Sequence, residues 1–152
     1  MQFFEPSRKN HGSYWFDWTT ADEIAWKENY QIWMQWVYEF WSRGGTVGLG
    51  SDAGSQQSLY GFGTVRELEL LQQAGFHPLE VLRSATFLGA QVLDMEDRIG
   101  SVRVGKLADL VVLNDNPLDD IRNTESVRYV MVNGRLYDAS TMDEIGNHPR
   151  ER

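Results

Sequence analysis

The sequence has 152 residues, with 22 acidic and 14 basic side chains, 3 histidines, no cysteine and a formal net charge of −8. This is the length of one ordinary domain, and 41% hydrophobic residues are enough for a folded core. The acidic balance argues against nucleic-acid or anionic-membrane partners, the lack of cysteine excludes thiolate chemistry, and no apolar run approaches the roughly 20 residues of a membrane span.

The N-terminal third is dominated by aromatic residues, since all 6 tryptophans lie within the first 41 residues. Residues 1–18 have no helical period and predict an irregular loop. Thr20-Ala-Asp-Glu23 matches a capping box, and apolar residues at helical spacing follow it, so we predict a helix that ends at Gly44-Gly45. We interpret its aromatic residues as packing surface rather than as a ligand-stacking site. They spread over more than one face, which requires more packing partners than a short chain offers.

The middle of the chain is predicted to hold one strand and three helices. The strand is the short apolar segment Thr46–Leu49. The first helix begins at a second capping box, Thr64–Glu67, and ends at Gly75. The other two helices are short, lie within Leu79–Leu93 and are separated by Gly89; Pro78, just before them, is a residue that the first turn of a helix tolerates.

After Gly100 the hydrophobic pattern changes to a period of two or to short apolar runs, which is typical of strands. The predicted strands are Ile99–Val104, Asp109–Leu113 and Val127–Val132, and Asn133-Gly134 is a hairpin turn that leads into Arg135–Tyr137. The segment from Asn147 reads as a polar tail. The element order predicts an α/β chain whose C-terminal part is a small sheet.

Asp52 is the strongest candidate for a catalytic or metal-binding residue. It follows the predicted strand directly, within Gly50-Ser-Asp-Ala-Gly54, and α/β folds place ligands at the carboxyl ends of strands. An aspartate there can ligate a divalent metal or act as a general base. On spacing alone, a turn aspartate that caps backbone N–H groups stays an alternative. The loop departs from the spacing of a dinucleotide-binding glycine motif, and the next helix begins too late for one.

Other candidate residues carry weaker signals. No two histidines have the His-x-His or His-x-x-x-His spacing of a metal site. His11, in the aromatic loop, and Tyr60 are candidate substrate contacts, whereas we interpret His77 as a residue at a helix start and His148 as solvated. The acidic stretch Asn114–Asp120 is interpreted as a turn between strands, because it lacks the closing glutamate of a calcium loop.

Several sequence stretches, taken together and in their order along the chain, form a pattern that is specific to one protein family. They are Gly50–Gly54; Arg66–Leu71 with Ala74–Glu80 and Leu82–Thr86; Ile99–Leu113 followed by Asn116-Pro-Leu; and Val130–Arg135. Residues from about 44 to 145 thereby resemble the C-terminal end of the amidohydrolase superfamily, in the branch of imidazolonepropionase-like and related metal-dependent hydrolases. The N-terminal third is similar to the seventh loop and helix of one subgroup.

The resemblance implies a fold and a domain organisation. The expected fold class is α/β, the last strand and helices of a TIM-like (β/α)8 barrel followed by part of a small flanking β-sandwich. A complete barrel needs roughly 250 residues. The expected divisions are residues 1–95 for the barrel portion, 96–140 for the sandwich segment and 141–152 for the polar tail.

The resemblance also implies a role for Asp52. In this family the aspartate after the eighth strand ligates the catalytic metal and accepts a proton from the metal-bound water. The expected cofactor is a divalent metal, zinc in the first instance. The family's other ligands, a His-x-His pair, often a carboxylated lysine and further histidines, would precede residue 1, so this chain is expected to supply at most one ligand.

The expected function is that of a metal-dependent hydrolase of C–N bonds other than peptide bonds, here as a C-terminal fragment that is inactive alone. The alternative is a non-catalytic binding or assembly module derived from this fold. The expected partners are the missing N-terminal barrel portion or a second copy, with a small-molecule substrate in the complete enzyme. Substrate, metal identity and compartment stay open, and the first residues show no signal-peptide pattern.

Overall fold

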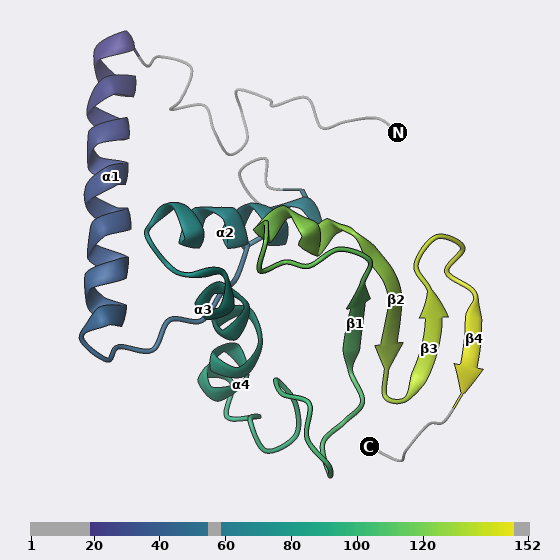
Figure 1. The fold of residues 1–152 in the computed structure, drawn as a ribbon. Coiled ribbons are helices and arrows are strands. Elements are labelled where there is room, and N and C mark those ends of the chain that lie inside the picture. The colour runs from purple at the N-terminus through teal and green to yellow at the C-terminus, as the bar shows by residue number, and fades with distance from the viewer. Residues whose placement is uncertain (1–18, 55–58, 148–152) are drawn as a thin grey trace.

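The computed structural model describes residues 19–54 and 59–147. Helices gather on one side of the molecule and an antiparallel sheet lies on the other (Figure 1). The elements in chain order are α1 (Thr20–Ser42), α2 (Phe62–Gln73), α3 (Pro78–Arg83), the π-helical turn η2 (Ser84–Leu88), α4 (Gly89–Val92), β1 (Leu110–Leu113), the 3-10 turn η3 (Ile121–Glu125), β2 (Val127–Val132), β3 (Arg135–Asp138) and β4 (Glu144–Asn147). The predicted α/β class is confirmed.

Helix α1 begins one residue earlier than the capping-box pattern predicts. Thr19, not Thr20, is the N-cap: its hydroxyl accepts a hydrogen bond from the backbone N–H of Asp22 at 3.3 Å, and the Asp22 carboxylate accepts one from the backbone N–H of Thr19 at 2.8 Å. Two adjacent threonines offer the same cap, and an aspartate replaces the expected glutamate at the third position. The helix ends at Ser42, just before the predicted glycine pair.

The predicted strand Thr46–Leu49 is wrong, because this segment is extended but pairs with no strand. Val47 and Leu49 are half-buried and pack against the core of the helical side. Gly48 lies close to α4, since a Cβ built on it would be 3.7 Å from the Cα of Gly89. A strand requires a hydrogen-bonded neighbour, and the described residues place none beside this segment.

Helix α2 begins at Phe62, so the second capping box, at Thr64–Glu67, is a wrong prediction. Gly61 is the N-cap and provides no side-chain hydrogen bond. The backbone N–H of Gly63 already donates to the carbonyl of Leu59 at 2.9 Å, so the chain is turning before Thr64 is reached. The helix ends at Gln73, followed by Gly75 at φ +113°, as predicted for a closing glycine.

His77 caps α3, in agreement with its sequence interpretation. Its Nδ1 accepts a hydrogen bond from the backbone N–H of Leu79 at 3.3 Å, Glu80 accepts one from the backbone N–H of His77 at 2.8 Å, and Pro78 occupies the first turn. The predicted break at Gly89 is displaced, because the irregularity is the preceding π-helical turn η2. Gly89 instead begins α4.

The sheet has the order β1-β2-β3-β4, with every neighbouring pair antiparallel. The strand predictions for β1, β2 and β3 are confirmed. Asn133 and Gly134, at φ +50° and +81°, form the predicted hairpin turn; the left-handed backbone of such a turn suits asparagine followed by glycine. β4 lies within the predicted tail region 141–152 and pairs with β3, which the polar sequence did not indicate.

The predicted strand Ile99–Val104 is also wrong, because the segment forms turns and bends. Lys106 organises it: its ammonium group donates to the carbonyl of Ile99 at 3.2 Å, to the hydroxyl of Ser101 at 2.6 Å and to the carbonyl of Glu96. Carbonyl groups that accept from this ammonium group need no strand partner.

A small core joins the two sides of the molecule. Leu68, Phe76, Val81 and Ile121 are buried together, and partly buried residues of α1 and of the extended segment pack around them. Ile121 belongs to η3, on the way into the sheet, whereas the other three belong to the helical side. The sheet is therefore anchored to the helices through η3. A second sheet, which a sandwich requires, is not among the described residues.

Candidate functional site

Asp52 lies at the carboxyl end of the extended segment, where the chain turns sharply. It has a left-handed backbone conformation with φ +45°, and Gly54, two residues on, has φ +96°. For a residue other than glycine this conformation costs on the order of 1 kcal/mol, and aspartate tolerates it better than most. The side chain is exposed. Backed by the half-buried Val47 and Leu49, the segment thus presents a carboxylate to solvent.

The structure brings Tyr60 next to the Asp52 loop. A Cβ built on Gly54 would lie 2.2 Å from the Tyr60 hydroxyl oxygen, so the hydroxyl group rests directly on the glycine. The ring is otherwise 80% exposed. Two of the residues named from sequence, Asp52 and Tyr60, therefore lie on the same loop region. His11 and His148 lie outside the described residues, and His77 is the cap of α3.

The described residues do not form a complete metal site. Within residues 19–54 and 59–147, no three histidine, aspartate or glutamate side chains are grouped so that they could hold a metal ion. Zinc in proteins takes three or four protein ligands, and Asp52 can supply only one. The described residues therefore do not fit the metal by themselves.

The acidic stretch before η3 is a hydrogen-bonded turn, as the sequence predicts. The side chain of Asn116 accepts from the backbone N–H of Leu118 at 3.1 Å, and Asp120 accepts from the backbone N–H of Arg122 at 2.9 Å. These are local side-chain-to-backbone bonds of the kind that stabilise turns. Nothing in this geometry indicates a calcium loop.

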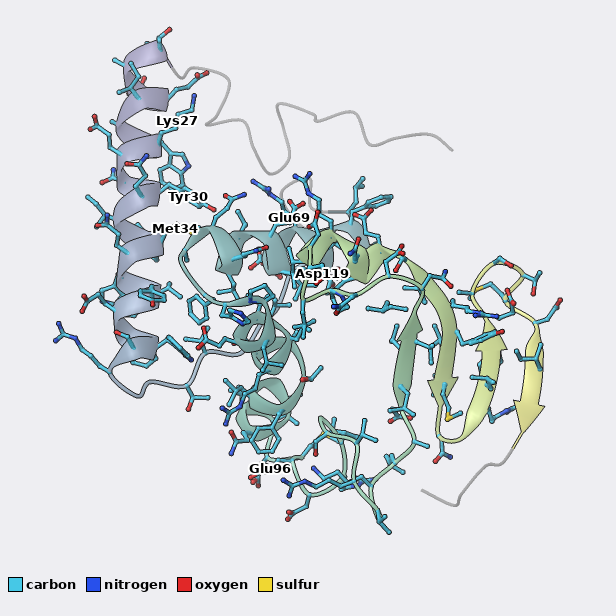
Figure 2. All side chains as sticks on the ribbon, in the orientation of Figure 1. Lys27, Tyr30, Met34, Glu69, Glu96 and Asp119 are labelled. Atoms are coloured by element: carbon cyan, nitrogen blue, oxygen red, sulfur yellow. The ribbon has the colours of Figure 1, made fainter. Side chains whose placement is uncertain are left out.

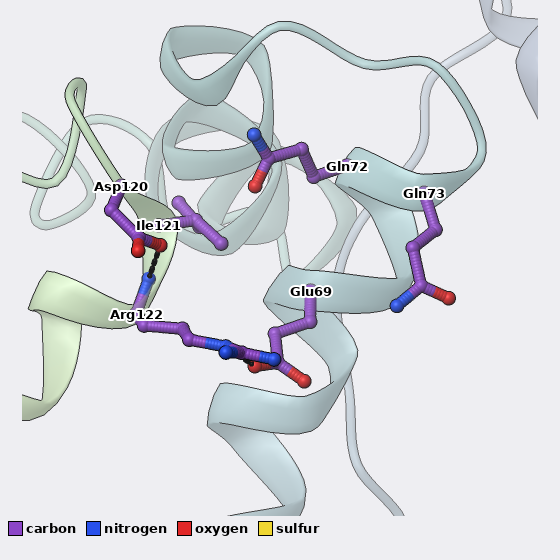
Figure 3. A pocket seen from close by; sticks show the side chains of 6 residues that line it. All are labelled: Glu69, Gln72, Gln73, Asp120, Ile121 and Arg122. Atoms are coloured by element: carbon purple, nitrogen blue, oxygen red, sulfur yellow. Dashed lines mark hydrogen bonds and ion pairs between the residues drawn. The ribbon is translucent and has the colours of Figure 1, made fainter.

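A cavity of about 310 Å³ lies between α2 and η3 (Figure 3). Two of the charged side chains that line it, Glu69 and Arg122, are paired with each other. Glu69 accepts hydrogen bonds from Arg122 at 2.5 Å and from Arg66 at 2.8 Å, and these bonds, that from Arg122 first, lower the pKa of Glu69 below its ordinary value. The lining residues are Glu69, Gln72, Gln73, Asp120, Ile121 and Arg122. We interpret the cavity as a structural junction, and no sequence spacing indicates it because its two sides are far apart in the chain.

Two groups near the contact between α1 and α2 have raised pKa values. Burial raises the pKa of Glu67, and Arg66 opposes this effect. Burial likewise raises the pKa of the Tyr30 hydroxyl, with Arg66 lowering it and Glu67 raising it further. Figure 2 shows Tyr30 and Met34 on the side of α1 that faces the other elements. These shifts follow from packing between helices, and neither group lies on the Asp52 loop.

The family of the chain follows from its sequence. The model of the Amidohydrolase family matches residues 36–137, about two thirds of the chain, and includes the Asp52 loop, the helices after it and most of the sheet. The chain belongs to the amidohydrolase family. Members of this family are generally metal-dependent, and the resemblance stated from sequence is confirmed.

Curated relatives give a more particular comparison. The chain is 32% identical over 107 residues to a 5'-deoxyadenosine deaminase of Methanobrevibacter smithii, which covers 64% of the chain and 25% of that protein. It is 31% identical over 119 residues to an S-triazine hydrolase of Gordonia rubripertincta, which covers 66% of the chain and 25% of that protein. These relatives are hydrolases that act on C–N bonds. The chain spans about a quarter of the length of the curated relatives it matches.

Solved structures give the same picture. A Xaa-Pro dipeptidase with bound methionine superposes with a TM-score of 0.62 at 32% identity, over 72% of this chain and 25% of that one. Phenylurea hydrolase B superposes with a TM-score of 0.63 at 27% identity, over 76% and 29%. Similarity to these amidohydrolases implies a TIM-barrel-type fold. Separately, none of the helices in the described part of the chain has the length and hydrophobicity of a membrane span.

Proposed function

We propose that this chain is the C-terminal part of a metal-dependent hydrolase that cleaves C–N bonds other than peptide bonds. Residues 1–95 belong to its TIM-like barrel and residues 96–140 to the flanking β-sandwich. The observation that carries the proposal is the position of Asp52, an exposed carboxylate at the end of a core-backed extended segment within the family-matched region. In barrels of this type, reacting groups sit at the carboxyl ends of the strands.

The proposal assigns roles to the residues of this loop. Asp52 is a catalytic carboxylate, able to accept a proton from an attacking water, and is one ligand of a divalent metal, zinc in the first instance. Gly54 lets a substrate or the Tyr60 ring approach the backbone closely. Tyr60, with its exposed ring beside this glycine, is a substrate contact.

The described residues do not group enough possible ligands to hold a metal ion. The proposal therefore includes that the 152-residue chain is inactive by itself. The remaining ligands come from barrel segments that the relatives have and this chain does not span. The alternative, a non-catalytic assembly module, predicts that Asp52 has no catalytic importance even when such segments are supplied.

The test places the chain in a complete barrel. In one chimera, the full 152-residue chain replaces the matched quarter of the S-triazine hydrolase, and its activity on an aminotriazine is compared with that of the isolated chain. We expect no turnover by the isolated chain with added zinc and measurable turnover by the chimera. Asp52→Asn in the chimera should reduce kcat by at least about 100-fold, the order of a lost catalytic group.

The control is Asp119→Asn, which alters an exposed carboxylate of the turn before η3 and should leave kcat unchanged. Turnover by the isolated chain would contradict the proposal. So would a folded chimera that keeps full activity after Asp52→Asn, and this result would favour the assembly module.

A further inference from the structure

Asn133 is the one asparagine in the 152 residues that a glycine follows. Asparagine is a thermolabile residue, because the backbone nitrogen of the next residue can attack its side-chain carbonyl carbon. A glycine in that next position has no Cβ to obstruct the attack. The sequence Asn133-Gly134, which forms the turn between β2 and β3, is therefore also the asparagine sequence of this chain best suited to the reaction.

The fold clamps this turn against the residues that lead into β1. The backbone N–H of Gly134 donates to the carbonyl of Ala108 at 3.1 Å, so the attacking nitrogen is engaged. The backbone N–H of Asn133 donates to the Asp109 carboxylate at 2.5 Å. Figure 1 shows the β2–β3 turn at the same end of the sheet as the start of β1. Attack by the Gly134 nitrogen therefore requires this clamp to open.

The side-chain oxygen of Asn133 is buried as well. Attack on the adjacent carbon places a negative charge on this oxygen, which is unfavourable where water cannot reach it. A cavity of about 250 Å³ lies beside the turn, and Asn133 and Gly134 line it together with Arg103 and Lys106. The turn can open toward this cavity without separation of the strands, so the reactive state is a local opening rather than the unfolded chain.

We propose that Asn133 is a site of spontaneous deamidation and that the reaction proceeds through local opening of the Asn133-Gly134 turn. The Gly134 nitrogen loses its proton to a solvent base and bonds to the side-chain carbonyl carbon of Asn133. The bond from that carbon to the side-chain nitrogen breaks, and this nitrogen takes a proton from water and leaves as ammonia. Water then opens the cyclic succinimide at either carbonyl. The product is aspartate or isoaspartate, with no oxidation or reduction.

The two products affect the sheet differently. Aspartate leaves the main chain unchanged and tolerates the left-handed backbone of this position. Isoaspartate adds a methylene group to the main chain, so the two-residue turn no longer holds Val132 opposite Arg135. The inference does not depend on the proposed function, because the reaction needs neither a metal nor a complete barrel.

The experiment follows the full 152-residue chain during incubation at about pH 8. Trypsin, which cleaves after arginine, releases Tyr129–Arg135, in which Asn133 is the sole amide side chain. Mass spectrometry measures the conversion of amide to acid, and fragmentation separates aspartate from isoaspartate. We expect conversion in the folded chain at a rate at least about tenfold below that of the chain unfolded in urea. The reference is the peptide Asn123–Arg128, where threonine follows Asn123, and it should convert more slowly than Tyr129–Arg135 in the unfolded chain.

Asp109→Ala tests the clamp. It should raise conversion at Asn133 in the folded chain and hydrogen exchange of the Gly134 amide by the same factor, at least about threefold. Asp115→Ala, at an exposed carboxylate beyond β1, is the matched control and should change neither rate. Gly134→Ala should slow conversion in the unfolded chain, where the fold has no influence, because its Cβ obstructs the attack.

Four results would overturn the inference. Equal rates in the folded and unfolded chains would remove the clamp, and conversion at Asn133 no faster than at Asn123 in the unfolded chain would remove the site. No conversion in the folded chain after weeks would confine the reaction to the unfolded state. A folded-state rate that follows the global stability of the variants but not the exchange of the Gly134 amide would exclude the local opening.

Discussion

Arg122 donates a hydrogen bond from Nε to the Glu69 carboxylate at 2.5 Å, and the pair links two elements that are 53 residues apart in the chain. Glu69 belongs to α2 and Arg122 to η3, which leads into the sheet. Beneath the pair, Ile121 is 2% exposed and joins the core of the helical side. An apolar anchor with an ion pair above it thus fixes the sheet to the helices.

The ion pair predicts a defined pH dependence of stability. Hydrogen bonds from Arg122 and Arg66 lower the pKa of Glu69 in the folded chain below its ordinary value of 4.5. The unfolded chain therefore binds this proton more tightly, so the stabilisation is complete above about pH 4.5 and is lost as the pH falls through the lower folded value. Glu69→Gln should lower the urea midpoint at pH 6.5 and have a smaller effect at pH 3.

The control for this prediction is Glu28→Gln, an exposed carboxylate of α1, which should change the urea midpoint little at either pH. An effect of Glu69→Gln that is equal at pH 6.5 and pH 3 would show that the carboxylate acts through packing rather than through its charge.

The elements that were predicted correctly have local causes. The hairpin between β2 and β3 follows from Asn133-Gly134, whose backbone preference sets the turn and hence the register of both strands. The start of α3 follows from His77 and Pro78 in the same way. Where two local signals compete, as at Thr19 and Thr20, the boundary moves by one residue.

The two wrong strand predictions concern interactions with residues outside the predicted segment. Thr46–Leu49 has the sequence of a buried strand, yet pairing depends on a neighbour that the described chain does not contain. Ile99–Val104 has the alternation of a strand, but the segment forms turns and bends, and Lys106 donates to the carbonyl of Ile99 and to the hydroxyl of Ser101. At the site, the position of Asp52 in a loop of small residues was readable from the sequence. The contact of Tyr60 with Gly54 is a packing contact within one loop region, and spacing does not reveal it.

Gly100 should not tolerate a side chain. It has φ +80°, and a Cβ on it would lie 2.6 Å from the Ala90 side chain and 2.9 Å from the Thr86 carbonyl oxygen. We expect Gly100→Ala to destabilise the chain by about 2–4 kcal/mol, the sum of a left-handed backbone penalty and an overpacking penalty. Gly105→Ala is the matched control: it has φ +96° with nothing within 4 Å, so only the backbone penalty applies. Equal urea-unfolding free energies for the two variants would contradict the packing described around Gly100.

Lys106 should be a stabilising residue of the segment between α4 and β1. Its ammonium group donates to two carbonyls and one hydroxyl within Glu96–Ser101. Lys106→Met keeps the length of the side chain but leaves these acceptors unpaired, which should cost about 1.5–3 kcal/mol. Lys27→Met, at an exposed lysine of α1, should have little effect. The comparison is made by urea unfolding, and similar losses for both variants would exclude the proposed role.

Zinc binding by the isolated chain should be weak, because one carboxylate cannot hold the ion tightly. We expect a dissociation constant no tighter than about micromolar in a competition titration, with Asp52→Asn changing it little. We also expect the isolated chain to self-associate through its exposed apolar surface, without a fixed stoichiometry. Nanomolar zinc affinity in a monomer would mean that this chain brings together ligands beyond Asp52. The proposal that the metal ligands are divided between this chain and other barrel segments would then be wrong. The isolated chain would have to be tested for activity with zinc bound.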